Sequence, residues 1–278
     1  MKIIDPNQLK NYLRARNLKP KDYMGQNFLI DDTVLSEIIN VADLKSSDTV
    51  LEVGPGLGIL TGELVKRVGL VWAIEKDSKL VSILKNEFAG EKKLKIVNED
   101  ILRFHVAREI LGPYKVVANI PYYLTSKLLQ FFLELQNPPK LMVLMIQKEV
   151  GERVVAKPGD LSILGISVQL YSDVEIATSV SRNSFWPVPE VDSVVLKITP
   201  KEKYPQIKDK KLFFRIVKTA FSGKRKMIQN TLAHGLDLSK ERAGELLIKA
   251  GIKPTDRPQD LTIEQWIRLY QQLDLQRN

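Results

Sequence analysis

Between Thr49 and Ile198, short aliphatic runs alternate with segments of helical periodicity, and this alternation limits the possible folds most strongly. Continuous apolar runs that end in Gly, Asp, Asn or Pro are typical of strands buried on both faces of a parallel sheet. Segments with apolar residues three and four positions apart are typical of helices that cover such a sheet. The predicted strands are Thr49–Gly54, Leu70–Asp77, Leu94–Asp100, Lys115–Pro121 and Leu141–Ile146, and the predicted helices are Ile59–Val68, Ser78–Phe88 and Thr125–Leu135. The repetition predicts an α/β fold with a mostly parallel, doubly wound, Rossmann-like sheet.

Two further predicted strands, Ser167–Ser181 and Asp192–Thr199, follow without a clear helix between them. Parallel strands need a crossover connection, so this arrangement favours an antiparallel end to the sheet. The polar stretch Thr199–Lys211 contains two prolines and predicts a domain boundary. We therefore expect one domain over residues 1–200, with residues 1–22 as a basic N-terminal arm, and a second over residues 201–278.

The second domain is predicted to be small and all-α. Its periodicity is helical throughout, and Ser239 and Thr262 stand at positions typical of helix N-caps. Gln265 completes a capping box with Thr262. The predicted helices are Leu212–Phe221, Lys226–Leu236, Lys240–Ala250 and Ile263–Leu273.

Charge and composition narrow the function. The net charge is +9, and residues 201–278 carry 17 basic and 9 acidic residues, so nearly all of the excess lies there. Such asymmetry favours a polyanionic partner, although a merely solvated surface explains charge alone equally well. There is no Cys and only two His, His105 and His234, which argues against disulfides, cysteine nucleophiles and a metal site. No secretory signal is visible and the longest aliphatic run, Leu141–Ile146, is short, so we expect a cytoplasmic protein without a membrane span.

Three successive strand ends carry residues suited to an adenosine-bearing ligand. A glycine turn, Gly54-Pro-Gly56-Leu-Gly58, lets the backbone approach a ligand, although a purely structural turn is a fair alternative. Glu75 can accept hydrogen bonds from ribose hydroxyls, and Asp100 can accept one from an adenine amino group. The turn lacks a basic residue for a pyrophosphate, and Ile59 replaces the last glycine of the dinucleotide fingerprint. Both points argue against NAD.

The fourth strand ends in Asn119-Ile120-Pro121-Tyr122, which suits a base held for reaction at its exocyclic amine. The Asn119 oxygen and the Ile120 carbonyl can accept the hydrogens of the amine, Pro121 stiffens the turn and Tyr122 offers a stacking face. An ordinary Pro turn is the alternative.

Two other segments contain candidate contacts to the substrate. Phe185, in a proline-rich loop near the junction, can press on the other face of the base, or it can be a packing aromatic between domains. A phosphate-binding surface is predicted in the second domain, where a solvated charged face is the alternative. Its predicted residues are Arg215, Lys218, Lys224, Arg225 and Lys226.

Taken together, the motifs resemble those of the small-subunit ribosomal RNA adenine dimethyltransferases of the KsgA/RsmA type. The resemblance covers nearly the whole chain, in order: GQNFL from Gly25, EVGPGLG, Glu75, Asp100, NIPY, FWPVPEVDS and AFSGKRKMIQN. Trp186 departs from it, since smaller residues are common after the phenylalanine. The resemblance implies a Rossmann-like class I methyltransferase domain that binds S-adenosylmethionine. It assigns cofactor contacts to Asn27, Leu29, Gly54, Glu75, Asp100 and Asn119, to which we add the neighbours Gln26, Gly56, Lys76 and Ile101.

The resemblance also implies the reaction: dimethylation of the N6 amines of two adjacent adenosines near the 3′ end of small-subunit (16S-type) rRNA, during ribosome biogenesis. The expected partner is this rRNA within a pre-ribosomal 30S-type particle, and we expect a monomer that uses no metal. The macrolide-resistance dimethylases of large-subunit rRNA share NIPY and are the nearest alternative. A dehydrogenase and a non-catalytic assembly factor on the same scaffold are more distant ones.

Overall fold

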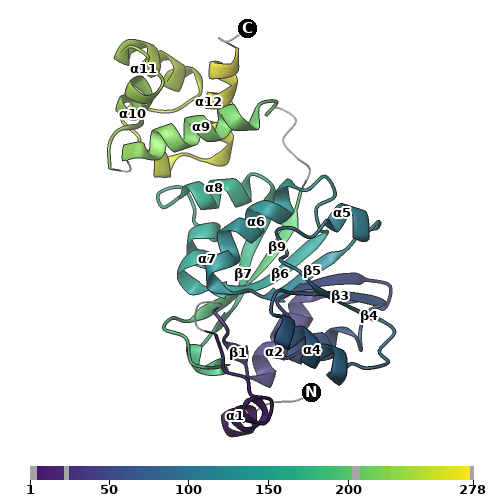
Figure 1. Ribbon diagram of the computed structural model, residues 1–278. Coiled ribbons are helices and arrows are strands. Elements are labelled where there is room, and N and C mark those ends of the chain that lie inside the picture. The colour runs from purple at the N-terminus through teal and green to yellow at the C-terminus, as the bar shows by residue number, and fades with distance from the viewer. Residues whose placement is uncertain (1–4, 22–24, 202–206, 224, 276–278) are drawn as a thin grey trace. The chain divides into compact units, whose positions relative to one another are not determined.

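The computed structural model describes residues 5–21, 25–201, 207–223 and 225–275 (Figure 1). Their contacts divide the chain into two compact units. Unit 1 comprises residues 1–151 and 173–200, and unit 2 comprises residues 152–172 and 201–278. The division after Pro200 lies at the expected position, but the segment 152–172 packs with the C-terminal helices. What each unit does stays a prediction.

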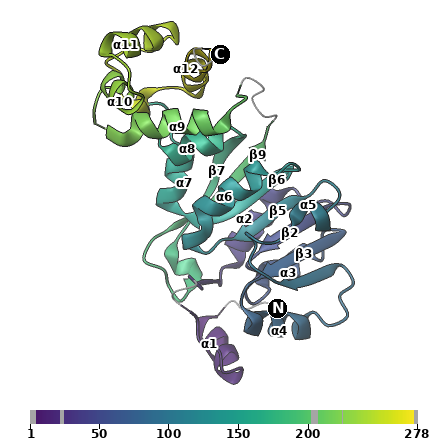
Figure 2. The ribbon, with the colours of Figure 1, turned by 45° about the horizontal axis from the view of Figure 1, so that its top comes forward.

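Unit 1 is built on a seven-stranded sheet in the order β4-β3-β2-β5-β6-β9-β7. The strands from β7 to β3 are labelled in the turned view of Figure 2. Strands β4, β3, β2, β5 and β6 are parallel, and β9 pairs with β6 in the antiparallel sense. This confirms the predicted α/β fold and its antiparallel end. The strands are β2 (Thr49–Val53), β3 (Leu70–Glu75), β4 (Leu94–Asn98), β5 (Lys115–Asn119), β6 (Leu141–Gln147), β7 (Ser172–Val180) and β9 (Ser193–Pro200).

Helices cover both faces of the sheet, with α6 on one side and α2 on the other (Figure 1). Central strand residues such as Val50, Leu51 and Val116 are fully buried, as continuous apolar strands require. Asp31 caps α2 by accepting the Thr33 N–H at 2.9 Å. The helices of this unit are α1 (Pro6–Ala15), α2 (Asp32–Ala42), α3 (Ile59–Leu64), α4 (Ser78–Glu87), α5 (Val106–Glu109), α6 (Thr125–Glu134) and the start of α7 (Lys148–Val155), with short 3₁₀ turns η2 (Tyr122–Leu124) and η3 (Arg182–Ser184).

A separate two-stranded sheet joins the N-terminal region to the junction loop. Strand β1 (Phe28–Leu29) pairs with β8 (Phe185–Trp186), so that Phe28 lies opposite Trp186 and Leu29 lies opposite Phe185. The Ser184 hydroxyl adds a 2.8 Å hydrogen bond to Asp31. Two motifs that are distant in the sequence are therefore held side by side.

The second unit is helical in its described residues. Its helices are α8 (Ile163–Gln169), α9 (Lys210–Ala220), α10 (Ile228–Gly235), α11 (Lys240–Lys249) and α12 (Ile263–Asp274), with 3₁₀ turns η4 (Phe221–Gly223) and η5 (Pro258–Asp260). The caps expected at Ser239 and Thr262 are present, and Gln265 closes the capping box. Gly159 exchanges backbone and side-chain hydrogen bonds with Gln259, which ties the segment 152–172 to this unit.

Two boundaries predicted from the sequence are wrong. Residues 167–169 belong to helix α8 and not to a strand, because the Ser162 hydroxyl accepts the Gly165 N–H at 3.1 Å and starts a helix that the β-branched residues had concealed. Helix α10 begins at Ile228, and Lys226 lies in the preceding turn, where its N–H bonds to the Gly223 carbonyl at 2.7 Å.

Candidate active site

A pocket of about 1150 Å³, including its open mouth, lies at the carboxyl ends of β2, β3 and β5 and at the turn after β4. Ligands of open α/β sheets bind at this edge. All of the residues predicted from the sequence for the cofactor and the base line this one pocket: Gln26, Asn27, Leu29, Gly54, Gly56, Glu75, Lys76, Asp100, Ile101, Asn119, Ile120, Pro121, Tyr122 and Phe185. The structure thus brings the two predicted groups together.

The glycine turn has a backbone that other residues rarely adopt. Gly54, Gly56 and Gly58 have φ angles of 65°, 60° and 83°, in the left-handed region that favours glycine. At Gly58 a Cβ atom would lie 2.6 Å from the Phe88 ring. Glycine is thereby required at these positions of the turn, of which Gly54 and Gly56 line the pocket, and Ile59 begins helix α3 directly after Gly58.

Glu75 ends strand β3 with its carboxylate held by two backbone donors. Its Oε2 accepts the Gly56 N–H at 3.2 Å, and its Oε1 accepts the Asp77 N–H at 2.8 Å. Burial raises the pKa of this carboxyl, while the two N–H groups partly oppose the rise. A carboxylate fixed in this way still has lone pairs for two hydroxyl groups.

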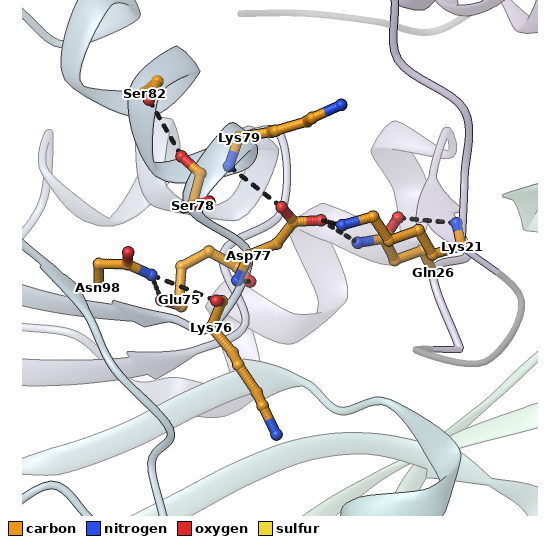
Figure 3. A network of polar contacts seen from close by, with 9 residues as sticks. All are labelled: Lys21, Gln26, Glu75, Lys76, Asp77, Ser78, Lys79, Ser82 and Asn98. Atoms are coloured by element: carbon orange, nitrogen blue, oxygen red, sulfur yellow. Dashed lines mark hydrogen bonds and ion pairs between the residues drawn. The ribbon is translucent and has the colours of Figure 1, made fainter.

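Asp77 connects this carboxylate to the N-terminal arm (Figure 3). The Asp77 side chain is 2.7 Å from the Lys21 ammonium and accepts a hydrogen bond from the Gln26 amide at 3.2 Å. The Gln26 oxygen in turn accepts the Lys21 N–H at 2.9 Å. Asp77 also caps helix α4 through the Lys79 N–H. No role for Asp77 was predicted from the sequence, although its place as a helix N-cap two residues after Glu75 was an available signal.

Asp100 is fixed at the turn after β4. Its Oδ2 accepts a hydrogen bond from the Lys76 ammonium at 2.9 Å, and its Oδ1 accepts the Leu102 N–H at 3.0 Å. Partial burial by itself would raise the pKa of Asp100, but these hydrogen bonds outweigh it and hold the pKa below its usual value. Asp100 is therefore an ionised acceptor at neutral pH.

The Asn119 side chain is oriented by the backbone of the N-terminal region. Its amide nitrogen donates to the Asn27 carbonyl at 3.4 Å, so its oxygen remains an acceptor in the pocket. The Ile120 N–H bonds to the Met145 carbonyl at 3.0 Å. Among the backbone hydrogen bonds of the described turns, loops and caps, none is accepted by the Ile120 carbonyl. Two acceptors are therefore available side by side in the sequence.

The two predicted stacking residues differ in their surroundings. The Tyr122 hydroxyl lies 3.0 Å from the Ser193 hydroxyl, which orients the ring, and burial raises the pKa of Tyr122. Phe185 lines the pocket but is only 1% exposed, because it packs in the core with Leu29, opposite it in the β1–β8 pair. Its stacking role stays a prediction.

Glu52 is a buried acid of the pocket wall for which sequence reasoning proposed no role. It is 1% exposed and accepts a hydrogen bond of 2.6 Å from the Thr61 hydroxyl. Burial raises the pKa of Glu52 to about 8, with a smaller contribution from the nearby Glu75 charge. Its position in an otherwise apolar strand was the available signal.

The predicted phosphate-binding residues are exposed in unit 2. Arg215 and Lys218 lie on helix α9, and Arg225 and Lys226 lie in the turn before α10. Within the described chain these four have no acidic partner, as expected of a surface for polyanions. Lys224 lies outside the described residues.

No described helix has both the length and the apolar character to cross a membrane. Likewise, no group of three or more His, Cys, Asp or Glu side chains in the described ranges is placed to hold a metal ion.

Comparisons with known proteins all find similarity to methyltransferases that modify rRNA or adenosine. The model of the ribosomal RNA adenine dimethylase family matches residues 17–275. A protein of Dehalococcoides mccartyi named ribosomal RNA small subunit methyltransferase A is 44% identical over 93% of this chain and 90% of its own. One of the same name from Moorella thermoacetica is 39% identical over 95% and 96%. A dimethyladenosine transferase from Plasmodium falciparum has a TM-score of 0.75 at 28% identity over 87% of this chain and 95% of its own. The 23S rRNA methyltransferase ErmE has 0.70 at 28% identity over 89% and 100%.

Proposed function

The chain belongs to the ribosomal RNA adenine dimethylase family, and on that premise we propose that it dimethylates the N6 amines of two adjacent adenosines near the 3′ end of small-subunit rRNA. S-adenosylmethionine is the methyl donor, and the enzyme acts as a cytoplasmic monomer on a pre-ribosomal 30S-type particle. The observation that carries the proposal is a single pocket in which a nucleoside-binding half, Glu75 and Asp100, adjoins an amine-binding half, Asn119 and Ile120.

The donor set of the pocket fits S-adenosylmethionine. Glu75 would hold the ribose hydroxyls, because its carboxylate is already aimed by the Gly56 and Asp77 N–H groups. Asp100 would accept the adenine amino group, with its charge kept by Lys76. When bound, S-adenosylmethionine supplies a methyl group on a sulfonium, which is electrophilic enough that the protein needs no metal or thiol.

The residues after β5 act on the amine of the target adenosine. The lone pair of this amine is delocalised into the ring, so it is a poor nucleophile. The Asn119 Oδ1 and the Ile120 carbonyl oxygen accept hydrogen bonds from the two N–H groups of the amine. This favours an sp³-like nitrogen whose lone pair is free to react. The Tyr122 ring stacks on the base. Positioning and desolvation thus account for the rate, and no side chain is required as a general base at the start.

The second methyl transfer places a different demand on the pocket. The monomethylated amine keeps one hydrogen, so a single acceptor engages it. We infer that stacking on Tyr122, and on Phe185 where its ring becomes accessible, then holds the base for the second transfer. This predicts a lower rate for the second step than for the first in variants that weaken stacking.

Product mapping tests the proposal against the large-subunit alternative, which the likeness to ErmE keeps open. The purified chain is incubated with labelled S-adenosylmethionine and, separately, small and large ribosomal subunits that lack the modification. We expect dimethyladenosine at two adjacent positions near the 3′ end of the small-subunit rRNA. Label in the large-subunit rRNA alone would replace the proposal by the alternative, and absence of label in both would overturn the enzyme activity itself.

A further inference from the structure

A second hollow of unit 1, which we call the arm groove, is more open than the active-site pocket. It lies between helix α1, the residues that follow α1, and the start of α4, and Trp186 forms part of its wall. Its described lining residues are Lys10, Leu13, Arg14, Asn17, Leu18, Lys19, Pro20, Lys21, Gln26, Phe28, Asp77, Lys79, Leu80 and Trp186. The proposed function makes no use of this groove.

The arm groove is strongly basic. Four exposed cations line it, namely Lys10, Arg14, Lys19 and Lys79. Asp77 is the single acidic side chain among the described lining residues, and the Lys21 ammonium lies 2.7 Å from it. A concave surface with this excess of positive charge attracts a polyanion.

Helix α1 is held firmly enough to present these charges. Leu9 and Leu13 are at most 2% exposed and pack against Phe28, Leu57 and Leu80 in one apolar cluster. Polar contacts add to this anchor at the other edge of the helix. The anchor leaves another face of the helix open, where Lys10 and Arg14 are four residues apart and therefore adjacent.

The polar anchor of the arm is Glu87 of helix α4. Its carboxylate accepts hydrogen bonds from the Tyr12 hydroxyl at 2.9 Å and from the Arg16 guanidinium at 3.1 Å. The Arg16 guanidinium also lies over the Tyr12 ring, 3.6 Å from its centre. Arg16 is thus used to fasten the helix and is not one of the groove cations.

The arm groove and the active-site pocket share a wall. Gln26, Phe28 and Leu80 line both hollows. The shared wall allows an RNA strand with one base in the pocket to extend its neighbouring nucleotides into the groove. The Lys10 ammonium also lies over the Trp186 ring, 5.8 Å from its centre, and cations beside an aromatic ring are typical of surfaces that bind single-stranded RNA.

We propose that the arm groove is a second RNA-binding surface, distinct from the cations of unit 2, and that it holds the backbone of the single-stranded nucleotides next to the base in the pocket. This inference rests on the proposed function, since it takes RNA as the substrate. It assigns Lys10, Arg14 and Lys19 to phosphate contacts that position the target.

The test compares two triple variants of the full chain. The groove variant carries Lys10→Ala, Arg14→Ala and Lys19→Ala. The control carries Lys92→Ala, Lys93→Ala and Lys140→Ala, which removes the same charge from exposed residues just before β4 and β6, at the edge of the parallel sheet opposite the pocket. The probe is a fluorescent 12-nucleotide single-stranded RNA with two adjacent adenosines, titrated at several salt concentrations.

We expect the groove variant to bind the probe about tenfold more weakly at low salt and to lower the magnitude of the salt slope by about 2, because each lost contact with single-stranded RNA removes about 0.7. Methyl transfer to the 30S particle should show a raised KM with an unchanged kcat. The dissociation constant of S-adenosylmethionine and the melting temperature should not change, which separates an RNA effect from a folding defect. The control variant should match the wild type.

Three results would overturn the inference. Equal salt slopes for the groove variant and the wild type would mean that these cations are only solvated and do not contact RNA. An equal loss in both triple variants would make the effect one of net charge. Displacement of the probe by a polyglutamate peptide as readily as by unlabelled RNA would make the groove a general polyanion site. If instead the wild type transfers no methyl group to any rRNA, the proposed function fails, and the binding measurements still decide about the groove.

Discussion

The active-site pocket of unit 1 and the cationic surface of unit 2 use their charged groups in opposite ways. In the pocket, Glu75 and Asp100 are each held by two donors, and Asn119 is turned by a backbone carbonyl. On the surface, Arg215 and Lys218 are exposed and have no acidic partner in the described chain. The difference indicates that methyl transfer needs hydrogen-bond acceptors with a fixed orientation. Binding of RNA instead needs positive charge on long side chains that can adjust to the phosphate backbone.

The largest expected effect tests the oriented acceptors of the active-site pocket. Asn119→Ala removes the acceptor proposed for the target amine and should lower kcat about 100- to 1000-fold, the loss typical of a positioned electrostatic group in an active site. The dissociation constant of S-adenosylmethionine, measured by calorimetry, should change by less than about tenfold. Turnover close to that of the wild type would remove Asn119 from the mechanism.

A smaller effect is expected on the nucleoside-binding half. Glu75→Gln keeps the size of the side chain but replaces one charged acceptor by a donor, and hydrogen bonds to charged groups contribute about 1.5–3 kcal/mol. The dissociation constant of S-adenosylmethionine should therefore rise about 10- to 100-fold, while kcat at saturating cofactor changes little. Binding as tight as in the wild type would exclude Glu75 from the ribose site.

The cationic surface should give a weaker and more diffuse response. Lys218→Ala, Arg225→Ala and Lys226→Ala together should weaken binding of small-subunit rRNA about tenfold and lower its salt slope by about 2 to 3. Lys240→Ala, Lys249→Ala and Lys253→Ala remove the same charge from the same unit and serve as the control. An equal effect of both sets would mean that the position of the cations is unimportant.

The buried acid Glu52 should have the smallest effect on activity, because its expected contribution is to stability. Its pKa is about 8 in the folded chain, above the ordinary value near 4.3, so the folded state binds one proton more than the unfolded state between these values. The free energy of unfolding should accordingly fall as pH rises through this window, by at most about 1.4 kcal/mol per pH unit from this group.

Glu52→Gln keeps an acceptor for the Thr61 hydroxyl and removes the titration. Denaturant unfolding at pH 5, 7 and 9 should show a flatter pH dependence than the wild type, and a variant relatively more stable at pH 9. Identical pH profiles of the two proteins would place the Glu52 pKa near its ordinary value.

The parallel part of the fold and most of the pocket could be predicted from the sequence, because strands buried on both faces leave continuous apolar runs and their ends carry the polar groups. The pairing of Leu29 with Phe185 could not be predicted, since it depends on residues far apart in the chain and on strands of two residues. The role of Asp77 was missed for a similar reason. Its partners Lys21, at the end of the N-terminal arm, and Gln26, which follows the arm, are distant in the sequence, and their position beside β3 depends on tertiary packing.

Helix α1 was missed as well, although Pro6 follows the cap residue Asp5 and Leu9 and Leu13 are four residues apart. The six basic residues among residues 1–22 are the more prominent pattern, and they mask the apolar stripe of the helix. Helix α8 was missed for a different reason, because it is short and rich in β-branched residues, which favour strands.

The position of β9 in the sheet has a consequence for how the protein is made. This strand is the last of the sheet in the sequence, yet it lies between β6 and β7 and not at an edge. During synthesis β7 therefore has no sheet neighbour until β9 has left the ribosome, and β6 keeps one open edge. Since pairing of distant strands is slow and open edges promote aggregation, the nascent chain passes through a stage in which six strands of the seven-stranded sheet are made but the sheet is incomplete.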